Sequence, residues 1–148
     1  MTCSRSIPGN LWRRFLKAEE MQIVSHCREE LIDITALVEA FVNKSNLVDG
    51  TVLIFVPHTT AAVTISENAD PDVKRDILYK LNKEFPPSDG YRHGEGNSDA
   101  HIKSSLVGPS LQVIVSNKKL LLGAWQGIYF CEFDGPRTRK IYLKSVAG

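Results

Sequence analysis

Apolar and polar positions follow different periods along the first part of the chain. Two short strand-like runs come first, Leu11 to Lys17 and Met21 to His26. Apolar residues then recur at helical spacing, at Ile34, Leu37, Val38, Phe41 and Val42. This period predicts an amphipathic helix that Asp33 or Thr35 caps at its start.

The middle of the chain predicts two strands and a second helix. Thr51 to Val56 is a nearly continuous apolar run rich in β-branched residues, which predicts a strand covered on both faces. Pro57 ends this strand, so His58 lies at a strand terminus. Ala61 to Glu67 predicts the next strand. A helix from Asp72 to about Glu84 follows an N-cap and a proline at its first turn.

The last third of the chain contains short strand-like runs separated by turn residues. They are Leu111 to Ser116, Leu120 to Gly123, Gly127 to Phe133 and Thr138 to Lys144. Strands at both ends and helices in the middle indicate an α+β fold, not an alternating parallel sheet. We expect antiparallel sheets packed as a β-sandwich or flattened barrel, with the two helices covering one side.

Composition indicates one cytoplasmic domain. The chain has 148 residues, of which 43% are hydrophobic and 24% charged, and we expect an irregular leader over 1–10 and a single domain over 11–148. A net charge of +1 gives no basic field for nucleic acid. No apolar run is long enough to span a membrane. Three cysteines without a CxxC spacing argue for a reducing compartment.

Candidate chemistry is concentrated between Tyr91 and Ser104. Polar side chains occur there at every second residue, at His93, Glu95, Asn97, Asp99 and His101. In an extended backbone all of them share one face, and in a helix starting at Asn97 that residue and His101 still share one. With His58 as a third imidazole, these groups have the ligand chemistry of a divalent metal, zinc before magnesium. A solvated loop without a ligand is the alternative.

Several stretches of the chain, in order and spacing, resemble one family. They are HTTAA (58–62), ENADPDV (67–73), HGEGNSDAH (93–101), GPSLQV (108–113) and GAWQGIYFCEFDGPR (123–137). They are similar to the YjbQ-like family of small uncharacterised proteins, some of which are described as secondary thiamine-phosphate synthases. Two residues depart from the family pattern. Ala124 replaces a threonine before Trp125, and Lys118 replaces a hairpin glycine, which predicts a different turn type.

The resemblance implies a sandwich-like α+β domain that assembles as a homotrimer, with a metal-capable pocket near subunit boundaries. It also implies a transferase that couples a pyrimidine diphosphate to a thiazole phosphate and releases pyrophosphate. The word secondary leaves the physiological substrate open. A non-catalytic module that binds a metal or small ligand, and a metal-dependent hydrolase, are the alternative functions.

Roles for individual residues follow from that expected chemistry. The expected metal ligands are His58, His93 and His101. The expected catalytic groups are His58, Glu95, Asp99 and His101. The residues expected to hold a phosphorylated substrate are Asn97, Lys103, Ser104 and Arg137. A solvated charge is the alternative for Lys103 and Arg137, and turn capping is the alternative for Asn97 and Ser104. Trp125 is expected in the core.

Overall fold

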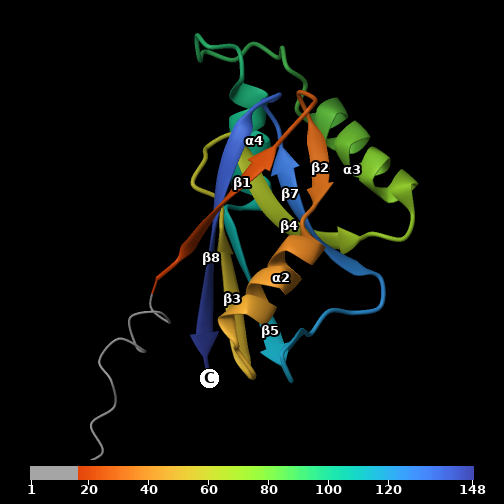
Figure 1. The fold of residues 1–148 in the computed structure, drawn as a ribbon. Helices are drawn as coiled ribbons and strands as arrows, with labels where there is room; N and C mark the ends of the chain where they lie inside the picture. The colour runs from red at the N-terminus through yellow and green to blue at the C-terminus, as the bar shows by residue number, and fades with distance from the viewer. Residues whose placement is uncertain (1–16) are drawn as a thin grey trace, which may run out of the picture.

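The computed structural model describes residues 17–148, so the expected leader and nearly all of the expected strand at 11–17 lie outside the described residues. The elements, in chain order, are β1 (Glu19–Val24), β2 (Glu30–Asp33), α2 (Thr35–Ser45), β3 (Gly50–Phe55), β4 (Ala61–Glu67), α3 (Pro71–Glu84), α4 (Ser98–Val107), β5 (Ser110–Ser116), β6 (Lys119–Leu120), β7 (Gln126–Glu132) and β8 (Thr138–Ala147) (Figure 1).

The strands form two antiparallel sheets. One has five strands in the order β1-β8-β3-β5-β6, and the other has three in the order β2-β7-β4. Every pairing is antiparallel. The α+β class predicted from the sequence is therefore confirmed, and the curled antiparallel sheets match the expected sandwich or flattened barrel.

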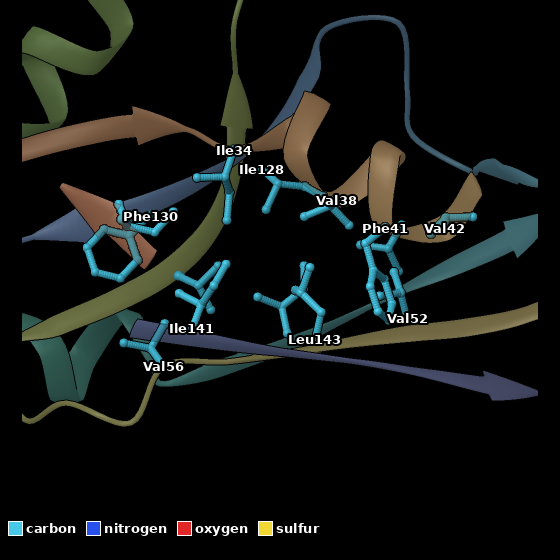
Figure 2. Close-up of a cluster of buried hydrophobic side chains, with 14 of the residues drawn as sticks. Ile34, Val38, Phe41, Val42, Val52, Val56, Ile128, Phe130, Ile141 and Leu143 are labelled. Atoms are coloured by element: carbon cyan, nitrogen blue, oxygen red, sulfur yellow. The ribbon is translucent and has the colours of Figure 1, made fainter. Parts of the chain in front are cut away.

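The main hydrophobic core lies between the two sheets and α2. Alternate residues of β3 and β8 point inward because side chains alternate along a strand. They meet apolar residues from α2 and β7, and the fully or nearly fully buried members include Val38, Phe41, Val52, Ile54, Ile128, Phe130, Ile141 and Leu143. Figure 2 shows the side chains of α2 and β7 pointing toward those of β3 and β8. This packing fixes the sheets against each other.

The other helices cover the opposite face of the three-stranded sheet. A second apolar cluster there is formed by Leu31, Ala62, Ala100, Tyr129, Cys131 and Phe133, with Ile77, Leu78 and Leu81 of α3 packed against it. The expected two helices are α2 and α3, and α4 is a third one formed by the polar stretch. None of the helices within residues 17–148 combines the length and apolar character required to cross a bilayer.

Two burial predictions are wrong. In β3, Val52 and Ile54 are fully buried while Phe55 is 42% exposed, which shows that this strand is covered on one face only. The doubly covered strand is β7, the middle strand of its sheet, whose neighbouring residues Phe130 and Cys131 enter different apolar clusters. Trp125, which was expected in the core, is 66% exposed. It lies in the link before β7, where its carbonyl accepts a hydrogen bond from the Asn68 amide.

The turn between β5 and β6 holds Lys118 in the left-handed region that glycine favours, and the expected change of turn type stays a prediction. Ser116 pairs with Lys119, so Asn117 and Lys118 form a two-residue hairpin loop. Both residues have a positive φ, 51° and 64°, which is the geometry of a type I′ turn. The amide of Lys118 donates to the Val48 carbonyl, and this bond ties the turn to the link before β3.

Candidate functional site

A loop leads from the end of α3 into α4 and carries the first part of the polar stretch. Gly90 and Gly96 have φ values of 68° and 73°, a region that glycine enters without a steric penalty. The Asn97 carbonyl then accepts from the amides of Ala100 and His101, so the helix starts at Ser98. The sequence left an extended and a helical backbone open for this stretch. The structure is helical from Ser98 onward, and the loop before it forms no strand.

The loop and the outer face of α4 enclose an open hollow of about 450 Å³. We call it the histidine hollow, and its lining residues are Tyr91, Arg92, His93, Ser98, His101 and Ile102. The apolar floor comes from Ile102 and the aromatic rings. The polar groups include a guanidinium, a phenol and a serine hydroxyl, all of which can donate hydrogen bonds. The surface of the hollow is largely apolar, and these donors are among its few polar groups.

Two of the predicted histidines meet in this hollow. The ring centroids of His93 and His101 are 5.3 Å apart, and the ring planes meet at 82°. Glu95 lies beside them, with its Oε2 3.6 Å from His93 Nε2 and its side chain 76% exposed. The structure thus brings together three of the predicted site residues from the loop and α4.

His58 has a separate role at the end of β3. Phe55 pairs with Tyr142, and continuing this register places Pro57 opposite Lys140. The Lys140 amide donates to His58 Nε2 at 2.9 Å instead. Burial, followed by the positive charge of Arg139, lowers the pKa of His58. The imidazole is therefore held neutral, and it is not among the residues that line the histidine hollow.

The inner face of α4 carries two charged side chains that are fully buried. Asp99 and Lys103 have no exposed surface. Arg28 donates to both oxygens of Asp99 at 3.0 Å. Lys103 Nζ lies 2.5 Å from Glu29 Oε1, 2.5 Å from Asn82 Oδ1 and 3.0 Å from Asp99 Oδ2. We call these five residues the buried charge cluster.

The cluster determines how Asp99 ionises. Burial alone would raise its pKa, but the hydrogen bonds from Arg28 and Lys103 outweigh it and lower the pKa below the ordinary value. Asp99 is therefore an ionised ion-pair partner. Its contacts are those of a structural ion pair, whereas the sequence predicts Asp99 as a catalytic group.

Three of the four predicted phosphate-holding residues donate hydrogen bonds within the protein itself. Arg137 Nη2 and Asn97 Nδ2 each donate to Asp134 Oδ2 at 2.8 Å. Lys103 belongs to the buried charge cluster. Within the described chain, Asn97 Oδ1 and Ser104 Oγ are buried without a hydrogen-bond partner. None of these four residues lines the histidine hollow.

A second buried ion pair lies near His58. Arg139 donates to both carboxylate oxygens of Glu132, at 2.9 and 2.6 Å, and to Thr60 Oγ1 at 2.8 Å. Ser25 Oγ donates to Glu132 Oε2 at 2.8 Å. These contacts join β7 of the three-stranded sheet to β8 of the five-stranded sheet through a single pair of opposite charges.

The sequence interpretation missed several of these residues. Glu132 gave a signal, because it is a carboxylate at the end of the apolar run of β7. The pairing of Asp99 with Lys103 also had a signal, because these two predicted site residues are four positions apart, which is the spacing of a helical ion pair. Arg28 and Asn82 gave none, since they reach the cluster only through folding. Arg92 also gave a signal as a cation directly beside His93, but it lies outside the pattern of polar residues at every second position.

The side chains of residues 17–148 do not complete a zinc site within one chain. Residues 17–148 contain no group of three or more His, Cys, Asp or Glu side chains placed to hold a metal ion. A zinc ion in a protein takes three or four such ligands. His93 and His101 supply two imidazoles, so a metal in the histidine hollow would need further donors from beyond these residues of one chain.

Comparison with known proteins places these features in a family. A family model described as UPF0047 protein YjbQ-like matches residues 19–148. The chain belongs to this family. The UPF0047 protein YugU of Bacillus subtilis is 56% identical over 127 residues, which is 85% of this chain and 96% of YugU. A UPF0047 protein of Methanocaldococcus jannaschii is 54% identical over 125 residues, 84% of this chain and 91% of its own length.

Solved structures of family members have the same fold. A crystal structure of an uncharacterised YjbQ/UPF0047 protein from Clostridium acetobutylicum has a TM-score of 0.85 and 55% identity. It covers 86% of this chain and 99% of that one. A protein of unknown function from Sulfolobus solfataricus also has a TM-score of 0.85, at 32% identity, and covers 89% of this chain and 97% of its own. The family and the α+β fold are thereby established.

Proposed function

We propose that this protein binds a phosphorylated small molecule in the histidine hollow. The observation that carries the proposal is the convergence of Arg92, His93 and His101 on one open hollow of about 450 Å³. That volume lies within the range of roughly 300–1,000 Å³ that is usual for small-ligand sites. The hollow combines a permanently charged guanidinium and two imidazoles with an apolar surface. This chemistry suits a heterocycle that carries a phosphate or diphosphate.

Each group has a role that its chemistry supports. Arg92 grips phosphate oxygens, because a guanidinium presents paired donors that match two oxygens at once. His93 and His101 donate hydrogen bonds to the remaining oxygens, and in its protonated form either imidazole can pass a proton to a leaving group. Ile102 and Tyr91 contact the apolar part of the ligand.

The reaction that we propose is the one that the family resemblance implies. The ring nitrogen of a thiazole phosphate forms a bond to the methylene carbon of a pyrimidine diphosphate, and the carbon–oxygen bond to the diphosphate breaks. Both bonding electrons leave with the pyrophosphate, and the thiazole becomes a cationic thiazolium. Negative charge grows on the departing oxygens, so donors placed there lower the barrier.

Assembly, metal and location are part of the same proposal. A homotrimer in the cytoplasm would place residues of a second copy near the histidine hollow. A zinc ion bound there would take His93 and His101 as two of its ligands, and the metal would then replace the proton-donating role of these imidazoles. A bound divalent ion supplies charge neutralisation to the diphosphate. The free Cys27 and Cys131 are consistent with a reducing compartment.

A non-catalytic binding module is the second candidate. The observation that favours it is the state of the predicted carboxylates. Asp99 is ion-paired inside the protein, and the side chain of Glu95 is 76% exposed. A hollow without a committed carboxylate base can bind a phosphorylated metabolite and leave it unchanged.

Calorimetric titration with pyrophosphate tests the binding proposal. Arg92→Gln is expected to weaken pyrophosphate binding at least tenfold, because a bidentate charged contact contributes about 1.5–3 kcal/mol. Arg75→Gln is the matched control, since Arg75 is an exposed arginine on α3 with a side chain 76% exposed. Equal affinities for wild type and Arg92→Gln would refute the site.

A turnover assay separates the two candidates. Incubation with both phosphorylated heterocycles should release pyrophosphate in wild type and less in His101→Gln. Tight binding of the same compounds without any pyrophosphate release would support the binding module instead.

A further inference from the structure

α4 presents two faces with different chemistry. Its outer residues Ser98, His101 and Ile102 line the histidine hollow. Its inner residues Asp99 and Lys103 are fully buried and belong to the buried charge cluster. The two sets alternate along a single helix of ten residues, so any rotation or slide of the helix moves both.

The buried charge cluster joins three separate parts of the chain. Arg28 and Glu29 come from the link between β1 and β2, Asn82 comes from α3, and Asp99 and Lys103 come from α4. Asn82 Nδ2 donates to Glu29 Oε2, which closes the network between α3 and the link. Two cations face two carboxylates, so the charges of the cluster balance.

Lys103 has no capacity left for a ligand. Its ammonium group carries three protons, and three oxygen atoms from Glu29, Asn82 and Asp99 lie within 3.0 Å of it. It is also 0% exposed. The residue therefore cannot hold a substrate phosphate while this network is intact.

Stability alone does not explain why a fold keeps such a cluster. Buried ion pairs are often replaced by apolar side chains without loss of stability. Their distinctive property is direction, because hydrogen bonds depend on angle, so those to Asp99 and Lys103 define the rotation of α4 about its axis in addition to its apolar contacts. His101 lies on the same helix, so the rotation of α4 also sets the direction in which the His101 side chain leaves it.

We infer that Asp99 and Lys103 are positioning residues that hold His101 against His93 in the histidine hollow. The orientation of the two imidazoles is independent of any ligand, and only its consequence for phosphate binding rests on the proposed function. Loss of the cluster lets α4 turn and opens the edge-to-face arrangement of the rings, now 5.3 Å between centroids.

The test compares Lys103→Met with Arg139→Met. Both variants remove one buried cation from a hydrogen-bonded ion pair, but Arg139 pairs with Glu132 and has no contact with α4 among its hydrogen bonds. Nuclear Overhauser contacts between the imidazole protons of His93 and His101 report ring orientation without a ligand. Titration with pyrophosphate reports the consequence.

In Lys103→Met we expect the contacts between the two imidazoles to weaken by at least half and the pyrophosphate Kd to rise at least tenfold. In Arg139→Met both should remain within twofold of wild type, even where thermal stability falls. If Lys103→Met does not fold, Asp99→Asn replaces it, because the amide retains the size of the carboxylate.

Unchanged imidazole contacts in the α4 variant, or equal changes in both variants, would overturn the inference. Absence of pyrophosphate binding in wild type would refute the proposed function instead. The imidazole contacts would still decide the positioning role in that case.

Discussion

A single imidazole completes the hydrogen bonding of β8 where β3 stops. His58 Nε2 accepts from the Lys140 amide at 2.9 Å, a role that only an unprotonated ring nitrogen can perform. Protonation would replace an acceptor with a donor that faces another donor. The residue predicted as a metal ligand thus has a clear structural role, and its catalytic role stays a prediction.

This contact predicts a pH dependence of stability. The pKa of His58 is lowered in the folded protein, whereas the unfolded chain titrates near its ordinary value of about 6.5. The stabilising contribution is therefore fully present above about pH 6.5 and is lost as pH falls toward the folded value. Urea unfolding between pH 7.5 and 5 should show a shallower decline in His58→Gln than in wild type. Parallel curves would contradict this account.

At the scale of elements, local sequence signals predicted the start of α3 better than they predicted which strand is buried on both faces. The N-cap and proline before α3 are local, and the structure begins that helix at Pro71 with Asp70 Oδ1 accepting from the Asp72 amide. Which strand is covered on both faces depends on its neighbours. β3 and β7 are both apolar runs, and only assembly places β7 in the middle of its sheet with a helical layer on one face and the core on the other.

The cap of α3 gives a prediction for one side chain. Asp70→Ala removes the acceptor for the Asp72 amide, so the free energy of unfolding should fall by about 0.5–2 kcal/mol. Chemical denaturation measures this change. Asp76→Ala, at an exposed position within the same helix, is the control and should change stability by less than about 0.5 kcal/mol. Equal effects would mean that the cap contributes nothing.

The corrected burial of β3 and β7 is tested with two phenylalanines. Phe130 of β7 is 0% exposed and Phe55 of β3 is 42% exposed. Phe130→Ala should lower the free energy of unfolding by about 3–5 kcal/mol because it leaves a cavity in the core. Phe55→Ala should cost well under half as much in a monomeric sample. A larger loss for Phe55→Ala would restore the original prediction.

The candidate site was predictable from the sequence in part. The histidines of the loop and α4 could be found because they are close in sequence, and a helix starting near Asn97 kept them together. The buried charge cluster could not be found, since Arg28 and Asp99 are 71 residues apart and meet only after the sheets have formed. For the same reason, sequence alone could not show that His58 contacts β8.

At the scale of the whole molecule, exposed apolar side chains offer a candidate contact surface for the proposed trimer. On the outer face of the five-stranded sheet, Ile114 is 55% exposed and Val146 is 44% exposed. Both pair with Thr51, so they lie on either side of one residue. Trp125 is 66% exposed. Contact with other copies would remove this surface from water.

Light scattering coupled to size exclusion tests the assembly. We expect a mass of three chains, and metal analysis of the same peak tests whether zinc accompanies the trimer. Ile114→Glu should reduce the fraction of trimer, because a carboxylate on an apolar contact surface is costly to bury. A monomeric mass at micromolar concentration would contradict the predicted trimer and its shared site.

The claim that the histidine hollow binds phosphorylated ligands is tested most directly by the protein's own four histidines. Imidazole resonances followed by NMR during titration with pyrophosphate report each ring separately. We expect the signals of His93 and His101 to shift in a saturable manner while those of the exposed His26 stay in place. Signals of His93 and His101 that do not move, or that move no more than those of His26, would contradict the account.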